Sequence, residues 1–364
     1  MTPSIPPGEY VSRRQLLLAQ FPALRLDALL VSHPPNVRYL TGFTGSHSVL
    51  LLHPDRTVLF TDPRYRLQAP LESSCPVRVA RGVLMVAALR LAARLKASSI
   101  GFESARLSHQ LHQNLNEHLC LCASLEPTFA LVESLRLLKS PREIALIRRS
   151  VLTTSNAFRR AIRLARPGLP ERDLAAELEY QMRRLGADQP AFETLVTCGP
   201  RSALPHARSS SSPLAPNELL LVDMGASQEG YSSDMTRMAF FGRPSTRVKK
   251  LHQAVLDAQT EALAAVRPGV SAAAIDRRAR SVLRAHGLGK AFAHSTGHGL
   301  GLEIHEAPRL GRGDKTRLAP GMVFTIEPGA YLEGFGGVRI EDTVLVTPAG
   351  CEVLTPTPKE LLLL

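Results

Sequence analysis

The second half of the chain repeats itself, and this repeat constrains the fold more than any other feature of the sequence. Pro167-Gly168 opens the segment PGLPERDLAAELEYQMRRLGA, and 101 residues later Pro268-Gly269 opens PGVSAAAIDRRARSVLRAHGL. Each segment has the pattern of a helix that ends at a glycine, the residue most common just after a helix. Because the period is longer than that of a solenoid, we predict two halves related by a pseudo-twofold axis, which face each other across a site.

Acidic residues recur at matching positions of the two halves. The segment LLLVDMG, residues 219–225, resembles VFTIEPG, residues 323–329, since each is an apolar strand that ends in an acid, with a glycine two residues later. A second acid follows each strand, so the four acids are Asp223, Asp234, Glu327 and Glu341.

Each pair of acids is expected to close a hairpin. Asp223 and Asp234 are symmetric about a turn between Gln228 and Glu229, and the other two acids are symmetric about Gly334. In a tight hairpin such side chains oppose each other, with Cβ atoms about 5 Å apart.

Four carboxylates on one buried surface repel one another unless they are protonated or neutralised. Divalent cations are a natural solution, because two metal ions can share bridging carboxylates, polarise a carbonyl group and lower the pKa of a bound water. Mostly oxygen ligation with one imidazole favours Mn, Co, Fe or Zn. Any one of these acids alone is explained as readily by an ordinary place at the end of a strand, but the matched segments favour a metal site.

The segment AHSTGHGLGLEIHE, residues 293–306, carries His294, His298 and His305 among glycines. Histidine is the commonest metal ligand and the usual proton carrier near neutral pH, and glycine lets the backbone approach a ligand closely. The alternative is a solvated loop that happens to contain several histidines. We predict that His298 completes the ligand set as an imidazole.

Residues 1–133 are expected to form a smaller α/β domain. Short apolar runs predict four strands, at residues 28–31, 49–52, 58–61 and 77–79. Farther along, Ser140 and Glu143 form a capping box with Pro141 at the first helical position, so a long helix should run to about Leu164. The second domain is therefore predicted over residues 134–364.

The composition excludes several classes of protein. The 364 residues are 44% hydrophobic and 21% charged, as in a globular protein with a large core. No apolar segment is long enough for a bilayer, no signal-peptide pattern is present, and the five cysteines form no CxxC pair, so we expect a cytoplasmic location. The net charge of +12 comes mostly from scattered arginines, and aromatics are only 5%, so neither nucleic acid nor a membrane is an expected partner.

With these residues in place, the sequence resembles the pita-bread metallopeptidases, a family that includes methionine aminopeptidase, aminopeptidase P and prolidase. The strings VDMG, SSDMTR, STGHGLGLEIHE, GMVFTIEPG and GGVRIED are similar to the family's motifs, and NVRYLTGFTG and TDPRY resemble its creatinase-type N-terminal domain. The resemblance covers nearly the whole chain. It implies an α+β fold, in which a pita-bread catalytic domain with an internal pseudo-twofold duplication follows a smaller α/β domain.

The resemblance also implies the ligands of two divalent metal ions, with Mn expected first and Co or Zn as alternatives. These ligands are Asp223, Asp234, His298, Glu327 and Glu341. Glu327 is implied to take the proton from the attacking water as well, because such a water needs a base beside it.

Residues around the ligands receive roles from the same resemblance. His206, in the string LPHA, is implied to steady the tetrahedral intermediate, and His305 to contact the substrate. His294 is implied to line the pocket, and Arg339 to orient Glu341 from outside the ligand set.

The implied activity is hydrolysis of the bond between an N-terminal residue and a following proline. We place aminopeptidase P activity on proline-containing peptides first, with Xaa-Pro dipeptidase (prolidase) activity as the alternative and a non-catalytic binding protein as a less favoured one. Arg38 and Arg64 lie in the N-terminal motifs and are candidates for binding a substrate carboxylate, although a structural ion pair within the domain explains each of them slightly better. We also expect a homodimer.

Overall fold

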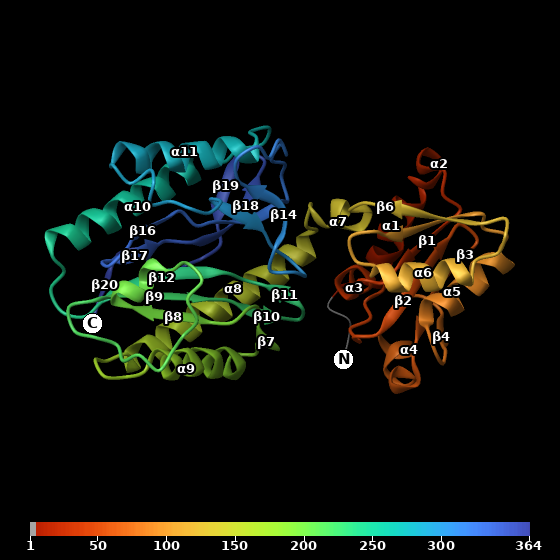
Figure 1. Ribbon diagram of the computed structural model, residues 1–364, viewed down its shortest axis with the longest axis horizontal. Coiled ribbons are helices and arrows are strands. Elements are labelled where there is room, and N and C mark those ends of the chain that lie inside the picture. The colour runs from red at the N-terminus through yellow and green to blue at the C-terminus, as the bar shows by residue number, and fades with distance from the viewer. Residues whose placement is uncertain (1–4) are drawn as a thin grey trace. The chain divides into compact units, whose positions relative to one another are not determined.

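The computed structural model describes residues 5–364, which divide into two compact units after Arg136 (Figure 1). The last element of the first unit is the helix α7 (Leu131–Arg136). A boundary after residue 133, as expected from the sequence, would cut through this helix.

The first unit is an α/β domain around one sheet, whose six strands lie in the order β4-β3-β2-β1-β5-β6. The pairs β1–β2 and β2–β3 are antiparallel, while β3–β4, β1–β5 and β5–β6 are parallel. The strands are β1 (Ala28–Val31), β2 (Ser48–His53), β3 (Arg56–Thr61), β4 (Val77–Val79), β5 (Ser99–Glu103) and β6 (Ser124–Thr128). The four predicted strands are present, and β5 and β6 are additional.

Helices lie around this sheet. They are α1 (Pro7–Leu18), α2 (Phe21–Leu24), α3 (Pro34–Thr41), the 3₁₀ turn η1 (Pro63–Tyr65), α4 (Gln68–Glu72), α5 (Leu84–Arg94) and α6 (His109–Glu117). The motif NVRYLTGF forms most of α3, and its first residue, Asn36, is fully buried. The Asn36 amide donates to Glu103 and accepts from Arg136, so the motif ties β5 and α7 together within the unit.

The second unit shows the predicted duplication. Its two helix pairs are α8 (Pro141–Ala161) with α9 (Glu171–Arg184), and α10 (Thr246–Ala264) with α11 (Ala272–Ala285). Each pair is followed by a glycine with positive φ, Gly186 or Gly287, as the repeated helix pattern predicted. The predicted capping box at Ser140 and Glu143 is present at the start of α8. In Figure 1, α10 and α11 lie on one side of the strands, and α9 lies on the other.

The strands of the second unit form several sheets. The four-stranded sheet has the order β20-β12-β9-β8, and the five-stranded sheet has the order β14-β13-β15-β18-β19. The strands are β7 (Gln189–Pro190), β8 (Leu195–Cys198), β9 (Leu219–Met224), β10 (Ala226–Gln228), β11 (Tyr231–Ser232), β12 (Met235–Phe240), β13 (Gly297–Gly299), β14 (Glu306–Leu310), β15 (Val323–Ile326), β16 (Gly329–Leu332), β17 (Gly336–Arg339), β18 (Asp342–Thr347), β19 (Gly350–Val353) and β20 (Leu362–Leu363), with 3₁₀ turns η2 (Ile162–Leu164) and η3 (Gly199–Ala203).

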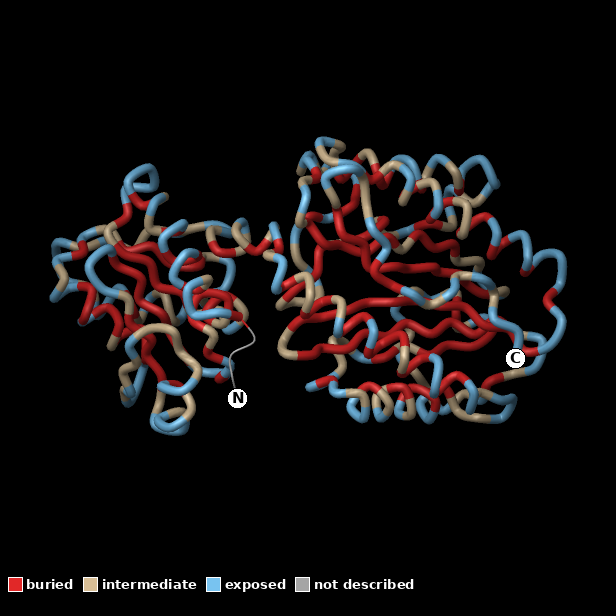
Figure 2. The backbone as a smooth tube through the Cα atoms, turned by 180° about the vertical axis from the view of Figure 1, so that it is seen from behind, coloured by how far each residue is buried: buried red, intermediate tan, exposed pale blue. Residues whose placement is uncertain are grey.

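The strands of this unit are the buried layer, and the helices expose their outer faces to solvent (Figure 2). Apolar side chains from β9, β12, β15 and β18 pack against the two helix pairs in two clusters, which contain residues such as Val222, Phe324 and Val255. The centre of the unit is therefore rigid, and side chains at the strand ends are fixed by the core beneath them.

One predicted hairpin is correct and the other is off by one residue. The strands β15–β18 and β16–β17 pair in a single register centred at Gly334, as predicted. In the other hairpin Asp223 pairs with Thr236 and Gln228 with Tyr231, so the turn is centred between Glu229 and Gly230. Both turn residues have positive φ, which is the conformation that a two-residue hairpin loop requires. Asp223 and Asp234 are therefore diagonal neighbours rather than direct opposites.

Candidate metal centre

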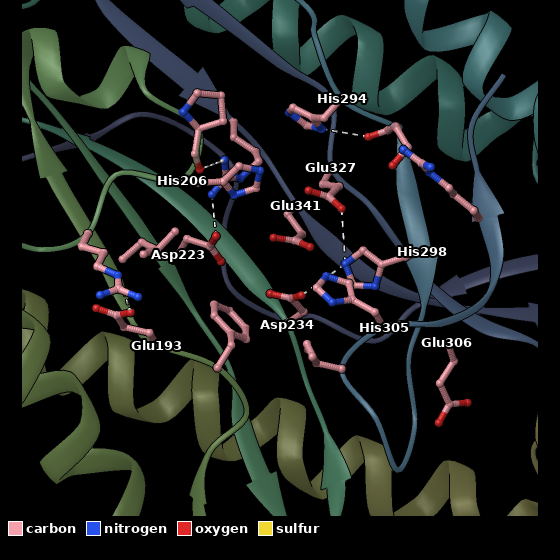
Figure 3. A pocket seen from close by; sticks show the side chains of 18 residues that line it. Glu193, His206, Asp223, Asp234, His294, His298, His305, Glu306, Glu327 and Glu341 are labelled. Atoms are coloured by element: carbon pink, nitrogen blue, oxygen red, sulfur yellow. Dashed lines mark hydrogen bonds and ion pairs between the residues drawn. The ribbon is translucent and has the colours of Figure 1, made fainter. Parts of the chain in front are cut away.

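The predicted site residues of the second unit line one cavity of about 630 Å³. The five predicted ligands, the three predicted histidines and Arg339 all contribute to its wall. In Figure 3 the four carboxylates point toward a common space beside His298. The other lining residues are Phe192, Glu193, Leu195, Pro205, Arg208, Ser295, Ile304, Glu306 and Arg309.

Strand ends place the five predicted ligands. Asp223 lies near the end of β9, and Asp234 comes directly before β12. Glu327 follows β15, and Glu341 directly precedes β18. His298 is the central residue of β13. Each half of the duplicated domain thus supplies two carboxylates, and the second half adds the imidazole.

The ligand atoms are close enough to share a cation. His298 Nε2 lies 3.5 Å from Asp234 Oδ2 and 3.4 Å from Glu327 Oε1. Asp234, His298 and Glu341 each offer one atom, and these three atoms lie within 4.8 Å of one another. Such a mixed oxygen and nitrogen set suits a divalent transition metal.

The buried oxygens of this cluster support a bound cation. Asp223 Oδ1, Asp234 Oδ1 and Glu341 Oε1 are buried and have no hydrogen-bond partner within residues 5–364. Buried polar atoms are nearly always paired, so three orphaned carboxylate oxygens facing one cavity fit a metal site. The residues present therefore fit the divalent cations that the sequence predicts.

The pKa values of these acids reflect the repulsion between their negative charges. Burial, then the charges of the neighbouring acids, raise the pKa of Asp234 and of Glu341 well above their usual values. Burial is also the main cause that raises the pKa of Glu327 to about 7. The raised pKa values mean that a divalent cation would compete with protons for these carboxylates.

Arg339 is buried beside the ligands and organises one side of them. It donates to Asp223 Oδ2, to the Thr236 hydroxyl at 3.0 Å and to the Tyr331 hydroxyl at 2.9 Å. Thr236 in turn donates to Glu341 Oε2 at 2.7 Å, so Arg339 reaches Glu341 through this hydroxyl. Sequence reasoning missed Tyr331, because the matching position of the first half is Ser227 and the repeat therefore does not mark a tyrosine.

The histidines occupy different environments. His294 Nε2 lies 2.8 Å from the Tyr331 hydroxyl, and burial lowers the pKa of His294 to about 4. The rings of His298 and His305 meet edge to face at 4.3 Å, and burial lowers the pKa of both. His206 is exposed on the turn after η3, at the wall of the cavity. All three predicted pocket histidines therefore reach the same cavity as the ligands.

Two glycines allow the strand that carries His298 to lie against its neighbours. A Cβ atom on Gly297 would lie 1.9 Å from the Thr325 carbonyl oxygen, and one on Gly299 would lie 2.1 Å from the Ala307 carbonyl oxygen. Only glycine fits at these two positions, which explains the GHG string.

Two buried ion pairs hold the segments on either side of His298. Asp276 pairs with Arg280 at 2.8 Å and accepts from the Thr296 hydroxyl, and Arg280 donates to the backbone of His294. On the other side, Lys139 pairs with Glu306 at 3.1 Å. Ion pairs thus hold the loop that carries the three histidines in place at both of its ends.

The N-terminal arginines predicted to contact substrate lie in the first unit. Arg64 belongs to η1 and pairs with Asp62 at 2.7 Å, which is the structural alternative foreseen from the sequence. Arg38 lies within α3. A role for either arginine in substrate binding stays a prediction.

Sequence reasoning missed a cation on the cavity wall. Arg309, on β14, is exposed, and its guanidinium makes no hydrogen bond or ion pair within the described residues 5–364. Arg208, also on the wall, pairs with Glu193 at 3.1 Å. The only sequence signal for Arg309 was its place three residues after the predicted histidine loop, which is too weak to identify a function.

Comparison with known proteins now identifies the family. A sequence model described as metallopeptidase family M24 matches residues 145–348, and one described as the creatinase/prolidase N-terminal domain matches residues 13–138. The chain belongs to metallopeptidase family M24. The α+β architecture predicted for this family, with a pita-bread domain after a creatinase-type domain, is confirmed.

Relatives of this M24 metallopeptidase cover nearly its whole length. An Xaa-Pro dipeptidase of Pyrococcus horikoshii is 36% identical over 93% of this chain and 95% of its own. The structure of an Xaa-Pro dipeptidase from Bacillus anthracis matches with a TM-score of 0.94 and 36% identity, over 98% of this chain and 100% of that one. An X-Pro aminopeptidase from Thermotoga maritima matches with a TM-score of 0.88 and 36% identity, over 93% and 98%.

The M24 assignment makes the protein a divalent-metal peptidase, as predicted. In the part of the chain that the structure describes, no helix combines the length and apolar character needed to cross a bilayer.

Proposed function

We propose that this M24 peptidase is an Xaa-Pro dipeptidase, which hydrolyses dipeptides whose second residue is proline. Similarity to Xaa-Pro dipeptidases over nearly the full chain supports this activity better than the aminopeptidase P activity that we placed first from the sequence. That first preference rested on the N-terminal motifs alone, and relatives of both activities share the same two domains.

The unpaired guanidinium of Arg309 is the observation that carries the proposal. An Xaa-Pro dipeptide ends in a carboxylate one residue beyond the scissile bond, whereas a longer peptide has a neutral amide there. Arg309 lies on the wall of the cavity and makes no ion pair within residues 5–364. A guanidinium binds a carboxylate with two parallel hydrogen bonds, so Arg309 suits the terminus that only the dipeptide presents at this place.

The ligand roles follow the prediction from the sequence. Asp223, Asp234, His298, Glu327 and Glu341 would hold two divalent cations, with Mn expected first. When bound, such cations supply Lewis-acid polarisation of the substrate carbonyl and a more acidic water. Because His298 is largely buried and its pKa is lowered, its ring is neutral and available as a ligand.

The residues of the chain then handle the proton and the substrate. The Glu327 carboxylate accepts the proton of the attacking water and returns it to the proline nitrogen as the bond breaks. His206 and His305, which come from different segments of the cavity wall, donate hydrogen bonds to the oxygen that becomes negative during attack. Arg339 holds Asp223 in place and reaches Glu341 through Thr236.

Proline explains why a site of this kind is needed. The residue after the scissile bond has no backbone N–H, and its φ is fixed. A peptidase that binds its substrate through that N–H is excluded, whereas a site that acts on the carbonyl side is not. The apolar side chains of Phe192, Leu195 and Ile304 on the cavity wall offer a surface for the pyrrolidine ring.

The experiment compares hydrolysis of an Xaa-Pro dipeptide and an Xaa-Pro-Yaa tripeptide, each with added Mn²⁺. We expect a higher kcat/KM for the dipeptide, and we expect Arg309→Ala to raise the KM for the dipeptide while leaving that for the tripeptide nearly unchanged. Arg312→Ala is the matched control, because Arg312 is an exposed arginine near Arg309 that does not line this cavity. A higher kcat/KM for the tripeptide would contradict the proposal and would support aminopeptidase P activity instead.

A further inference from the structure

Two cysteines of the first unit lie in contact on a surface turn. Cys120 and Cys122 are in the connection between α6 and β6 (Figure 1), and their sulfur atoms are 3.6 Å apart. The Ala123 amide donates to the Cys120 carbonyl oxygen at 3.0 Å, which closes the turn around Leu121 and Cys122. Both cysteines and Leu121 are exposed. Nothing in the metallopeptidase chemistry uses this pair.

We propose that Cys120 and Cys122 form a thiol–disulfide exchange site, which reacts with low-molecular-weight disulfides and closes to an intramolecular disulfide. The class of co-substrate is a small, soluble disulfide of the glutathione type. The site is a CxC pair, so it escapes a search for the CxxC spacing of known dithiol motifs.

The geometry favours closure of the pair. A disulfide has an S–S length of about 2.05 Å and bridges Cα atoms about 4.4–6.8 Å apart. Residues two apart within a hydrogen-bonded turn meet that span, since even the ends of a four-residue turn lie within about 7 Å. The two sulfur atoms must approach by about 1.6 Å from their separation of 3.6 Å, and rotation of two exposed side chains supplies this.

The reaction balances in two exchange steps. The Cys120 thiolate attacks one sulfur of the small disulfide, whose S–S bond breaks, and one small thiolate leaves and takes a proton. Cys122 then loses its proton and attacks the Cys120 sulfur of this mixed disulfide, and the second small thiolate leaves and takes a proton. Two electrons pass from the protein dithiol to the small disulfide, which is reduced to two thiols.

The contact between the sulfur atoms assigns the order of attack. A hydrogen bond with Cys120, followed by the charge of Cys120, raises the pKa of Cys122. Cys122 therefore holds its proton more tightly, and since its sulfur lies 3.6 Å from that of Cys120 we assign the first attack to Cys120 and the resolving role to Cys122.

The other cysteines provide internal controls. Burial raises the pKa of Cys75, Cys198 and Cys351, and Cys198 is almost fully buried. No second thiol contacts any of the three within residues 5–364. A raised pKa lowers the thiolate fraction and burial limits access, so these cysteines should react with a small disulfide more slowly than the exposed pair.

The test incubates the full-length protein with glutathione disulfide and locates modified cysteines by alkylation and mass spectrometry. We expect the wild-type protein to lose the thiols of Cys120 and Cys122 together and to retain no glutathione. Cys122→Ser should retain glutathione on Cys120, because the resolving thiol is gone. Cys351→Ser is the control and should behave as the wild type. Circular dichroism would verify that these substitutions leave the fold intact.

Three results would overturn the proposal. The first is wild-type protein that keeps glutathione on Cys120 without forming the internal disulfide. The second is reaction of Cys75, Cys198 or Cys351 as fast as the exposed pair. The third is no loss of thiols at the turn while free glutathione disulfide remains.

Discussion

The buried ion pair between Lys139 and Glu306 should stabilise the second unit strongly. Lys139 Nζ lies 3.1 Å from Glu306 Oε2, and the two side chains are only 1% and 7% exposed. The Glu306 carboxylate also accepts from the backbone of Glu303, so it fixes the loop before it. Replacing Lys139 by Met would keep the apolar stem of the side chain and remove the charge.

The magnitude follows from the distance and the burial. Two unit charges at this separation attract by about 5 kcal/mol at an effective dielectric constant of about 20. Desolvation of both ions offsets much of this attraction in the intact pair, but Lys139→Met removes the ammonium group that lies 3.1 Å from the buried Glu306 carboxylate. We therefore expect Lys139→Met to lower the free energy of unfolding by about 3–5 kcal/mol.

Urea unfolding followed by circular dichroism would measure the effect, and hydrogen exchange of residues 299–306 would report the local loosening. The double variant Lys139→Met/Glu306→Gln should be less destabilised than the sum of the two single variants, because both charges of this pair are removed together. Arg148 and Glu352 are the matched control, since Arg148 lies on α8 soon after Lys139 and both partners are about 40% exposed. Their pair should contribute at most about 1 kcal/mol. Equal losses for Lys139→Met and Arg148→Met would refute the reasoning from burial.

Further predictions concern the cavity and the first unit. Glu327→Gln should lower kcat by about 100-fold or more because the base is lost, and an unchanged kcat with normal metal content would count against that role. His206→Ala should lower kcat while metal content, measured by elemental analysis, stays constant; loss of metal would instead make His206 a ligand. Chelation should abolish hydrolysis and added Mn²⁺ should restore it, whereas full turnover by metal-stripped protein would exclude the metal mechanism. Hydrogen bonds from Ser98 and Ser99 lower the pKa of Asp27, so Asp27→Asn should be less stable than wild type at pH 7. That difference in urea midpoint should shrink as the pH falls below about 4 and through the lowered pKa of Asp27; a difference that stays constant from pH 7 into strong acid would contradict it.

Much of the second unit was predictable because its features repeat. The strand, acid and glycine pattern occurs twice, so each occurrence supported the other, and the ligand cavity could be expected from the matched acids. The turn of the hairpin at Asp223 was predicted one residue too early, because Glu229 in this turn has positive φ. A non-glycine residue seldom adopts this conformation, so the sequence gives little sign of it. The register was therefore shifted by one residue at the turn.

Single residues without a local pattern could not be found in this way. The tertiary fold alone brings Tyr331 and Arg309 to the site, and neither residue belongs to a periodic motif. In the first unit, β6 was missed because Pro127 interrupts it, and proline is tolerated there only because β6 is an edge strand.

The duplication has a consequence for the topology of the unfolded chain. Asp234 and Glu327 come from different halves, and roughly 90 residues separate them in the sequence. A cation held by both would therefore act as a removable cross-link, which closes a loop of that length as a disulfide would. By the chain-entropy argument, a covalent link across about 100 residues removes denatured-state freedom equivalent to about 4–5 kcal/mol. A metal bound by both halves would therefore stabilise the folded chain against unfolding, and this stabilisation would grow with the metal concentration.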